Sequence, residues 1–300
     1  MWASADRCAT DALKNIEEST DYAMNKPPLF PPYTSLVGRA WFFASRGFNV
    51  LVLLFLVSPI LVMIPLSFSD SSFLMYPIKS FSLRWYENLF SSDDWVRAAQ
   101  NSFIVAPAAT VIATVLGTLA AVGLNKADFR GKGILMAILI SPMIVPVVVV
   151  GVGVYLFFAR IGLSDSYLGL ILAHAALGAP FVVTTVLATL QGFNHNLVRA
   201  SLSLGASPLR TFFRVTLPVI APGLISGALF AFATSFDEVV LTLFVAGPEQ
   251  ATLPRQMFAG IKDNISPTIA ALATILIIFS TCLLLALEWL RGRNKAAARF

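Results

Sequence analysis

The chain has 300 residues, of which 57% are hydrophobic and 12% are charged, and its formal net charge is +5. Soluble domains are about 25% charged, and a mean hydropathy of +0.78 leaves too few polar groups to cover a water-exposed surface. These values exclude a disordered chain and indicate a polytopic membrane protein. The two cysteines, Cys8 and Cys282, are too few and too differently placed for a disulfide framework or a metal site.

Residues 1–47 are predicted to form a cytoplasmic arm that is partly disordered or interfacial. The acids Asp6, Asp11 and Glu17 occupy positions where a signal peptide needs positive charge and an apolar stretch. The mixed charge of this segment is typical of a solvated arm. Met24, which precedes a proline cluster at 27–32, is as suitable a start as Met1, and the sequence leaves both open.

Six apolar runs follow, each with roughly the 20 residues needed to cross a bilayer. They cover 48–68, 102–124, 134–158, 167–190, 217–245 and 267–287. The fold class predicted is therefore all-α, with six transmembrane helices over 48–290 and a cytoplasmic tail at 291–300. The fifth run differs from the others because it contains ionised residues well inside it.

The distribution of Lys and Arg predicts which side of the membrane each segment faces. The two termini and the segments 125–133 and 191–216 contain 15 of the 21 Lys and Arg residues. By the positive-inside rule, both termini are expected in the cytoplasm. The net positive charge then follows from topology, and we expect no nucleic-acid partner.

Local patterns within the runs predict how the helices pack. Small residues at four-residue spacing favour close helix contacts in lipid. Such rows occur in the second and fifth runs: Ala109, Ala113, Gly117 and Ala121, and Gly223, Gly227, Ala231 and Ser235. Pro142 and Pro146 predict a kink in the third run.

Motifs for catalysis are absent from the sequence. It contains no G-x-x-x-x-G-K-[ST] phosphate loop and no H-E-x-x-H zinc motif. His174 lies in an apolar run and His195 in a polar loop, so each is expected to be a packed or solvated histidine rather than a metal ligand. We therefore expect that this chain is not an enzyme by itself and holds no cofactor.

The segment 191–216 is predicted to form two short helices around a tight turn. The first helix extends through Leu204, and Gly205 is the left-handed residue that ends it. Ser207 is the N-cap of the second helix and Pro208 its first residue. Four apolar residues are too many for a solvated linker, which favours docking of a partner over a purely structural role: Leu202, Leu204, Phe212 and Phe213.

The same segment carries a family resemblance. Arg199-Ala200-Ser201, followed after three residues by Gly205-Ala206-Ser207, resembles the E-A-A-x-x-x-G signature of type I ABC importer permeases. Three further segments resemble the spermidine/putrescine permease C-subunit group: 81–86 (FSLRWY), 235–240 (SFDEVV) and 252–257 (TLPRQM). The resemblance covers 48–293, nearly all of the membrane portion.

The resemblance implies half of a bacterial inner-membrane importer for a polyamine such as spermidine or putrescine. The implied partners are membrane lipid, a second permease subunit in a heterodimer, an extracytoplasmic solute-binding protein, and two ATPase subunits that bind ATP and Mg. The implied ATPase contact comes from Arg199, Ala200, Ser201, Leu204, Gly205 and Ala206. The sequence departs from the family at Arg199, where Glu is common, so the sign of any ion pair there is reversed. The residues alone leave one alternative open, an ion-coupled secondary transporter or channel that acts without an ATPase.

Asp237 and Glu238 are adjacent acids within the fifth run, and intramembrane charge usually marks function. If this run is one continuous helix, Glu238 shares a row with Thr234 and Thr242 near the extracytoplasmic end. The four residues are then a candidate transport pathway for a cation. A local alternative is that Ser235 and Glu238 have the spacing of a capping box, so that the helix breaks here and Glu238 satisfies backbone donors.

Overall fold

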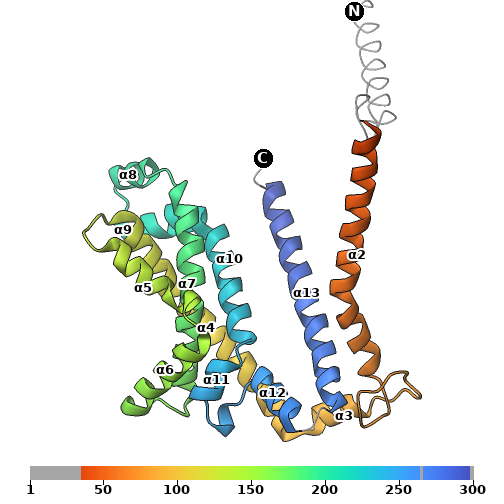
Figure 1. Ribbon diagram of the computed structural model, residues 1–300. Helices are drawn as coiled ribbons and strands as arrows, with labels where there is room; N and C mark the ends of the chain where they lie inside the picture. The colour runs from red at the N-terminus through yellow and green to blue at the C-terminus, as the bar shows by residue number, and fades with distance from the viewer. Residues whose placement is uncertain (1–34, 264–265, 298–300) are drawn as a thin grey trace, which may run out of the picture. The chain divides into compact units, whose positions relative to one another are not determined.

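The computed structural model describes residues 35–263 and 266–297. Most of the predicted N-terminal arm and the end of the tail lie outside these residues. Within them the regular elements are helices, joined by loops of which the longest lies between α2 (Leu36–Leu66) and α3 (Arg84–Ser91) (Figure 1). The β pairing in the described residues is a single bridge between Ser69 and Phe81. The chain divides into two compact units, residues 1–62 and 63–300.

Among the described residues, four helical segments are long and apolar enough to cross a membrane. They are α2 (Leu36–Leu66), α4 (Asp93–Lys126), α7 (Tyr167–Gln191) and the continuous run Pro208–Phe236, whose last part is α10 (Leu217–Phe236). The final predicted run lies in α13 (Pro267–Ala297). The all-α, membrane-spanning class is confirmed, while six crossings and the cytoplasmic placement of the termini stay predictions.

The third predicted run is broken rather than kinked. α5 (Lys132–Ile144) and α6 (Val147–Ile161) meet at an angle of 108°. Val145 between them is extended, with φ −71° and ψ 134°. A residue before proline is pushed out of the helical region, and Pro146 itself has no N–H to continue the ladder. Pro142, by contrast, lies inside α5 without ending it.

The predicted small-residue rows are contact faces, and both pack on α7. All eight residues of the two rows are buried. A β-carbon on Gly117 of α4 would lie 2.8 Å from Cβ of Val182, and one on Gly227 of α10 would lie 2.8 Å from Cα of the same residue. Glycine is therefore required on both sides of α7 for the helices to approach this closely.

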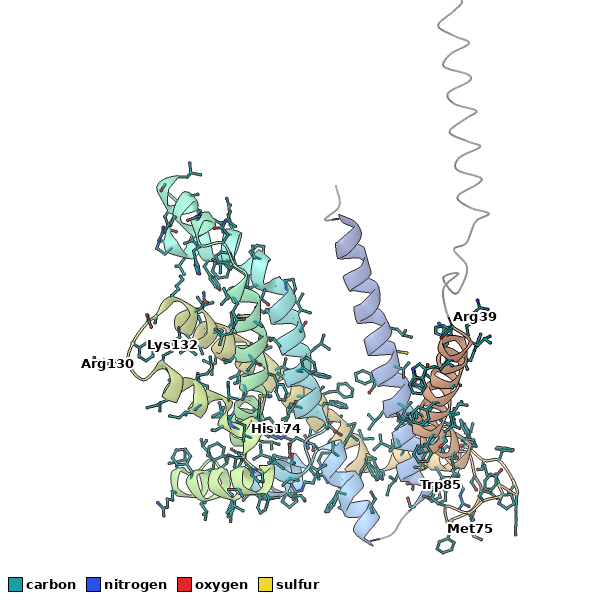
Figure 2. The ribbon with its side chains drawn as sticks, turned by 45° about the horizontal axis from the view of Figure 1, so that its top comes forward. Arg39, Met75, Trp85, Arg130, Lys132 and His174 are labelled. Carbon is teal, nitrogen blue, oxygen red and sulfur yellow. The ribbon has the colours of Figure 1, made fainter. Side chains whose placement is uncertain are left out.

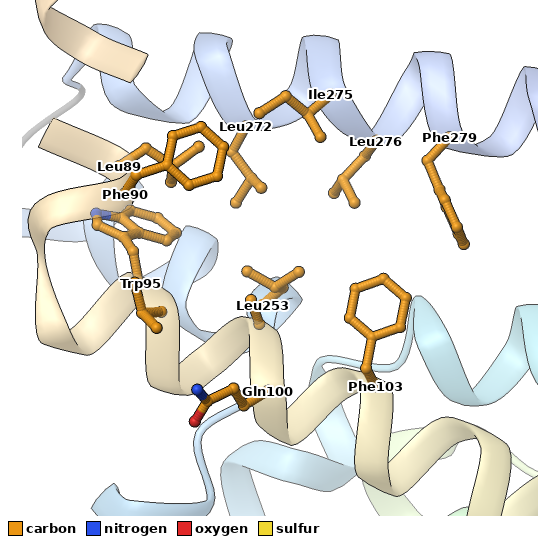
Figure 3. A pocket seen from close by; sticks show the side chains of 12 residues that line it. Leu89, Phe90, Trp95, Gln100, Phe103, Leu253, Leu272, Ile275, Leu276 and Phe279 are labelled. Carbon is orange, nitrogen blue, oxygen red and sulfur yellow. The ribbon is translucent and has the colours of Figure 1, made fainter. Parts of the chain in front are cut away.

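The remaining elements pack around the ends of these helices. α11 (Val240–Val245) shares an apolar cluster with α6 and α7 that contains Phe158, Leu177 and Leu241. α3 (Arg84–Ser91) and α12 (Leu253–Asp263) flank an apolar groove of about 430 Å³ between α4 and α13 (Figure 3). The groove is lined mainly by aromatic and aliphatic side chains such as Trp95, Phe103 and Phe279.

Polar side chains fix the turn η2 (Pro248–Gln250) and the residues beside it to the helices. The amide of Asn101 on α4 donates to the carbonyls of Glu249 and Ala251, each at 2.8 Å, and accepts from the Tyr167 hydroxyl at 2.8 Å. Arg255 on α12 donates to the carbonyls of Ala246 and Gly247. Burial lowers the pKa of Arg255 below its usual range, and nearby Asp165 opposes this shift.

Candidate functional site

The first helix of the loop between α7 and α10 ends as predicted. α8 runs over Asn196–Ser203, with Leu204 as C-cap and Gly205 in the left-handed region at φ +80°. The N–H of Gly205 donates to the carbonyl of Leu202 at 3.0 Å, and the N–H of Ala206 donates to the carbonyl of Ser201 at 3.2 Å. These two bonds form a Schellman motif, which satisfies carbonyls at the helix end. The loop therefore turns at a defined position.

The second helix also begins as predicted. α9 (Pro208–Thr211) has Ser207 as its N-cap, and the Ser207 hydroxyl accepts from the N–H of Arg210 at 3.3 Å. The hydroxyls of Ser201 and Thr211 lie 3.0 Å apart and join α8 to α9. One π turn, Phe212–Thr216, then leads directly into α10. The sequence did not predict this π turn.

The loop exposes several apolar side chains and carries positive charge. Leu204 is 88% exposed, Leu209 72% and Phe213 60%. Phe212, which was grouped with them in the sequence, is half-buried. The loop 191–216 contains three Arg residues and no Asp or Glu. Such a surface can bind a partner that offers an apolar groove lined by acidic groups.

The six residues proposed for ATPase contact lie together on α8 and the turn that follows it. Arg199, Ala200, Leu204 and Gly205 are exposed, while Ser201 and Ala206 are half-buried. Within the described part of the chain, Arg199 forms no ion pair. Its guanidinium is therefore available to a partner.

The fifth predicted run is two helices, not one. α10 ends at Phe236 and α11 begins at Val240. Glu238 lies in the break, where its Oε1 accepts the N–H of Leu241 at 2.8 Å. This bond satisfies one of the free donors at the start of α11. The fifth run is therefore not one continuous helix. The helix breaks and Glu238 satisfies a backbone donor, as the local alternative expects, but the donor is the N–H of Leu241 on α11.

The break separates the four candidate pathway residues. Asp237 is exposed, while Thr234 and Glu238 are half-buried. Thr242 on α11 is fully buried, and its hydroxyl donates to the carbonyl of Glu238 at 3.2 Å. The single helical row expected for Thr234, Glu238 and Thr242 does not form. Asp237 and Glu238 both lie in the break between α10 and α11.

His174 is a packed histidine, one of the two settings expected from the sequence, but the sequence did not reveal its partners. It lies on α7 (Figure 2). The residue is 1% exposed. Its Nδ1 is 2.9 Å from the Ser235 hydroxyl of α10, and its Nε2 is 3.1 Å from the Thr242 hydroxyl of α11. His174 thus bridges both sides of the break.

The described residues bring together no group of three His, Cys, Asp or Glu side chains that could hold a metal ion. The arrangement offers exposed apolar and basic side chains on one loop and two acids at a helix break.

Comparisons with known proteins agree with this reading of the fold. The family model described as "Binding-protein-dependent transport system inner membrane component" matches residues 113–295. The chain is similar to the spermidine/putrescine transport system permease protein PotC of Haemophilus influenzae, with 33% identity over 85% of this chain and 98% of the relative. It is also similar to the putrescine transport system permease protein PotI of Escherichia coli K12, with 34% identity over 74% of this chain and 82% of the relative.

A solved structure has the same fold. It is the crystal structure of a bacterial ABC transporter involved in the import of the acidic polysaccharide alginate. One of its chains matches with a TM-score of 0.68 and 15% identity, and the match covers 87% of this chain and 99% of that chain. The two sequences have diverged, while the arrangement of helices is shared.

Proposed function

The chain belongs to the family of binding-protein-dependent transport system inner membrane components, and we propose that it forms half of the translocation path of an ATP-driven importer for a polyamine. As a type I ABC importer permease it acts in a membrane, here the inner membrane of a bacterium. A second, different permease subunit completes the path, and an extracytoplasmic binding protein delivers the solute.

In this proposal the loop 191–216 is the surface on which the ATPase docks. The observation that carries it is the locked turn at Gly205, which presents exposed Leu204, together with exposed Leu209 and Phe213 nearby. A turn fixed by backbone bonds can transmit a displacement to α10, because the chain from Pro208 to Phe236 is one continuous helical run. Two ATPase subunits bind ATP and Mg, and this chain hydrolyses nothing itself.

Two features support a cationic solute. Asp237 and Glu238 provide negative charge at the break between α10 and α11, and Asp237 is exposed there. The similar PotC and PotI proteins are named for spermidine and putrescine transport. A polyamine carries several positive charges at neutral pH, so acids along its path lower the cost of its passage.

The test is purification of this chain from its native membranes, followed by reconstitution in liposomes. We expect an ATPase and a second permease subunit to co-purify, and uptake of radiolabelled spermidine to require ATP and the binding protein. Solute flux by this chain alone would instead support the ion-coupled carrier. ATP-dependent uptake of sugars or anions but not polyamines would contradict the substrate class alone.

A further inference from the structure

Three side chains from three helices form one chain of hydrogen bonds at the break in the fifth predicted run. Ser235 is in the last turn of α10, His174 is on α7, and Thr242 is on α11. His174 contacts the Ser235 hydroxyl at 2.9 Å and the Thr242 hydroxyl at 3.1 Å. All three residues are at most 5% exposed. Water therefore cannot substitute for these partners without rearrangement of the packed helices.

The direction of the bond between His174 and Thr242 follows from the bond between Thr242 and Glu238. The Thr242 hydroxyl donates its proton to the carbonyl of Glu238 at 3.2 Å, so its oxygen must accept from Nε2 of His174. The Ser235 hydroxyl lies 2.9 Å from Nδ1, and the direction of this bond is set by the tautomer of the imidazole. The chain of bonds thus runs from α10 through α7 to the backbone of Glu238.

Glu238 is consequently held at two points. Its carbonyl accepts from Thr242, and its side chain accepts the N–H of Leu241. The second bond fixes Glu238 to α11, while His174 fixes α11 to α7. The histidine thus acts together with the apolar cluster that packs α11 on α6 and α7 to set the location of the acid. The described hydrogen bonds reach Glu238 from His174 through Thr242.

We propose that His174 is a positioning residue, which holds α10 and α11 on α7 so that the acids of the break, Asp237 and Glu238, are presented to the solute. The functional part of this statement rests on the proposed function. The mechanical part does not, because it concerns only the relative placement of α7 and α11. The two parts are therefore tested by separate measurements.

The mechanical test uses nitroxide labels on exposed positions of the two helices, Leu168 on α7 and Leu243 on α11. The background has Cys8→Ser and Cys282→Ser, and the assembled transporter is used. We expect one narrow distance distribution in the parent protein. His174→Leu, which keeps the volume and removes both bonds, should broaden or shift this distribution.

A milder variant and a matched control keep this test decisive. Thr242→Val is isosteric and removes the last link, so it should also broaden the distribution, even if His174→Leu does not assemble. Thr274→Val is the control, because Thr274 is 3% exposed and its hydroxyl donates to the carbonyl of Ala270 in the same helix. Distributions in the two test variants that superimpose on the parent would overturn the proposal.

The functional test is a double-mutant cycle on spermidine uptake. If His174 acts through Glu238, His174→Leu combined with Glu238→Gln should transport no worse than the more impaired single variant. If uptake by the double variant falls by the product of the two single losses, the two residues act independently. That result would contradict the positioning role of His174. If spermidine is not transported even by the parent, the proposed function fails while the distance measurement still decides the mechanical part.

Discussion

The hydroxyl of Ser201 lies 3.0 Å from the hydroxyl of Thr211, and the two residues belong to the two helices on either side of the turn at Gly205. Thr211 is 3% exposed, so its hydroxyl depends on this partner. The two Schellman hydrogen bonds join backbone groups within the turn, and the hydroxyl pair joins the side chains of the two helices across it. Together these bonds join α8 and α9 across the turn, directly before the helical run that leads into α10.

The hydroxyl pair can be tested by proteolysis of the loop. Thr211→Val keeps the side-chain shape and removes one partner, which should weaken the loop by about 1 kcal/mol. Because cleavage follows the population of the open loop, trypsin should cut at Arg199 or Arg210 about fivefold faster. Thr184→Val is the control, since its hydroxyl bonds only within α7. Equal cleavage rates in both variants would mean that the pair does not stabilise the loop.

Gly205→Val tests the coupling role that we propose for the turn. A β-carbon there would meet no atom within 4 Å, but φ is +80°, so the side chain imposes backbone strain of about 1 kcal/mol or more. The variant should insert in the membrane normally and lose binding of the ATPase or solute-stimulated ATP hydrolysis.

The matched control for the turn is Gly192→Val, because Gly192 also has open space but a φ of −92°. It should retain most of the stimulated hydrolysis. Normal transport by Gly205→Val at normal expression would refute the coupling role of this glycine.

Arg199 provides a test of charge at the proposed ATPase contact. If its exposed guanidinium pairs with an acid of the ATPase, Arg199→Glu should weaken assembly more than Arg199→Ala does. The difference should shrink as salt is raised, because exposed pairs are screened. Co-purification of the ATPase at increasing salt measures both effects, and Arg160→Glu on α6 is the control. If the two Arg199 variants retain the ATPase equally at all salt concentrations, Arg199 forms no ion pair with the ATPase.

The contact faces of α4 and α10 were predictable because they are local patterns. Gly117 and Gly227 lie in four-residue rows that are visible in the sequence, and α7 packs against both. The turn at Gly205 was also predictable, since glycine, N-cap serine and proline each restrict the backbone in a known way.

The contacts of His174 were not predictable, since its partners are 61 and 68 residues away in the chain. No local pattern relates residues so far apart, and a histidine in an apolar run is most simply a packed one. The 108° bend between α5 and α6 was likewise underestimated as a kink. Proline marks the position of a bend, whereas its angle depends on which neighbouring groups satisfy the freed carbonyls.

Gly227→Ala tests the packing of α10 on α7. The new β-carbon would lie 2.8 Å from Cα of Val182, so the two helices must separate. Such overpacking costs about 1–3 kcal/mol and outweighs the gain in helix propensity of at most about 1 kcal/mol. The thermal unfolding midpoint of the purified protein should fall by several degrees. Gly123→Ala has no atom within 4 Å and should unfold at the parent temperature or above it; a similar midpoint for both variants would contradict the close contact.

Glu238 has two possible roles that a single substitution separates. As a cap it needs only an oxygen that accepts the N–H of Leu241, a bond of 2.8 Å in the native protein. As part of the pathway it needs its negative charge. Glu238→Gln retains an acceptor oxygen and removes the charge, whereas Glu238→Ala removes both.

For a pathway role, Glu238→Gln should assemble normally and import spermidine at a maximal rate about tenfold lower, which corresponds to about 1.4 kcal/mol in the barrier. The measurement is initial uptake into liposomes at saturating binding protein, with transporter content matched. For a role limited to capping, Glu238→Gln should match the parent in both rate and assembly, and Glu238→Ala should lose about 1 kcal/mol of stability. Asp237→Asn extends the comparison, because Asp237 is exposed and its side chain is not involved in the cap. Parent-like uptake by Glu238→Gln would remove Glu238 from the pathway, and a loss confined to Asp237→Asn would assign the charge requirement to Asp237.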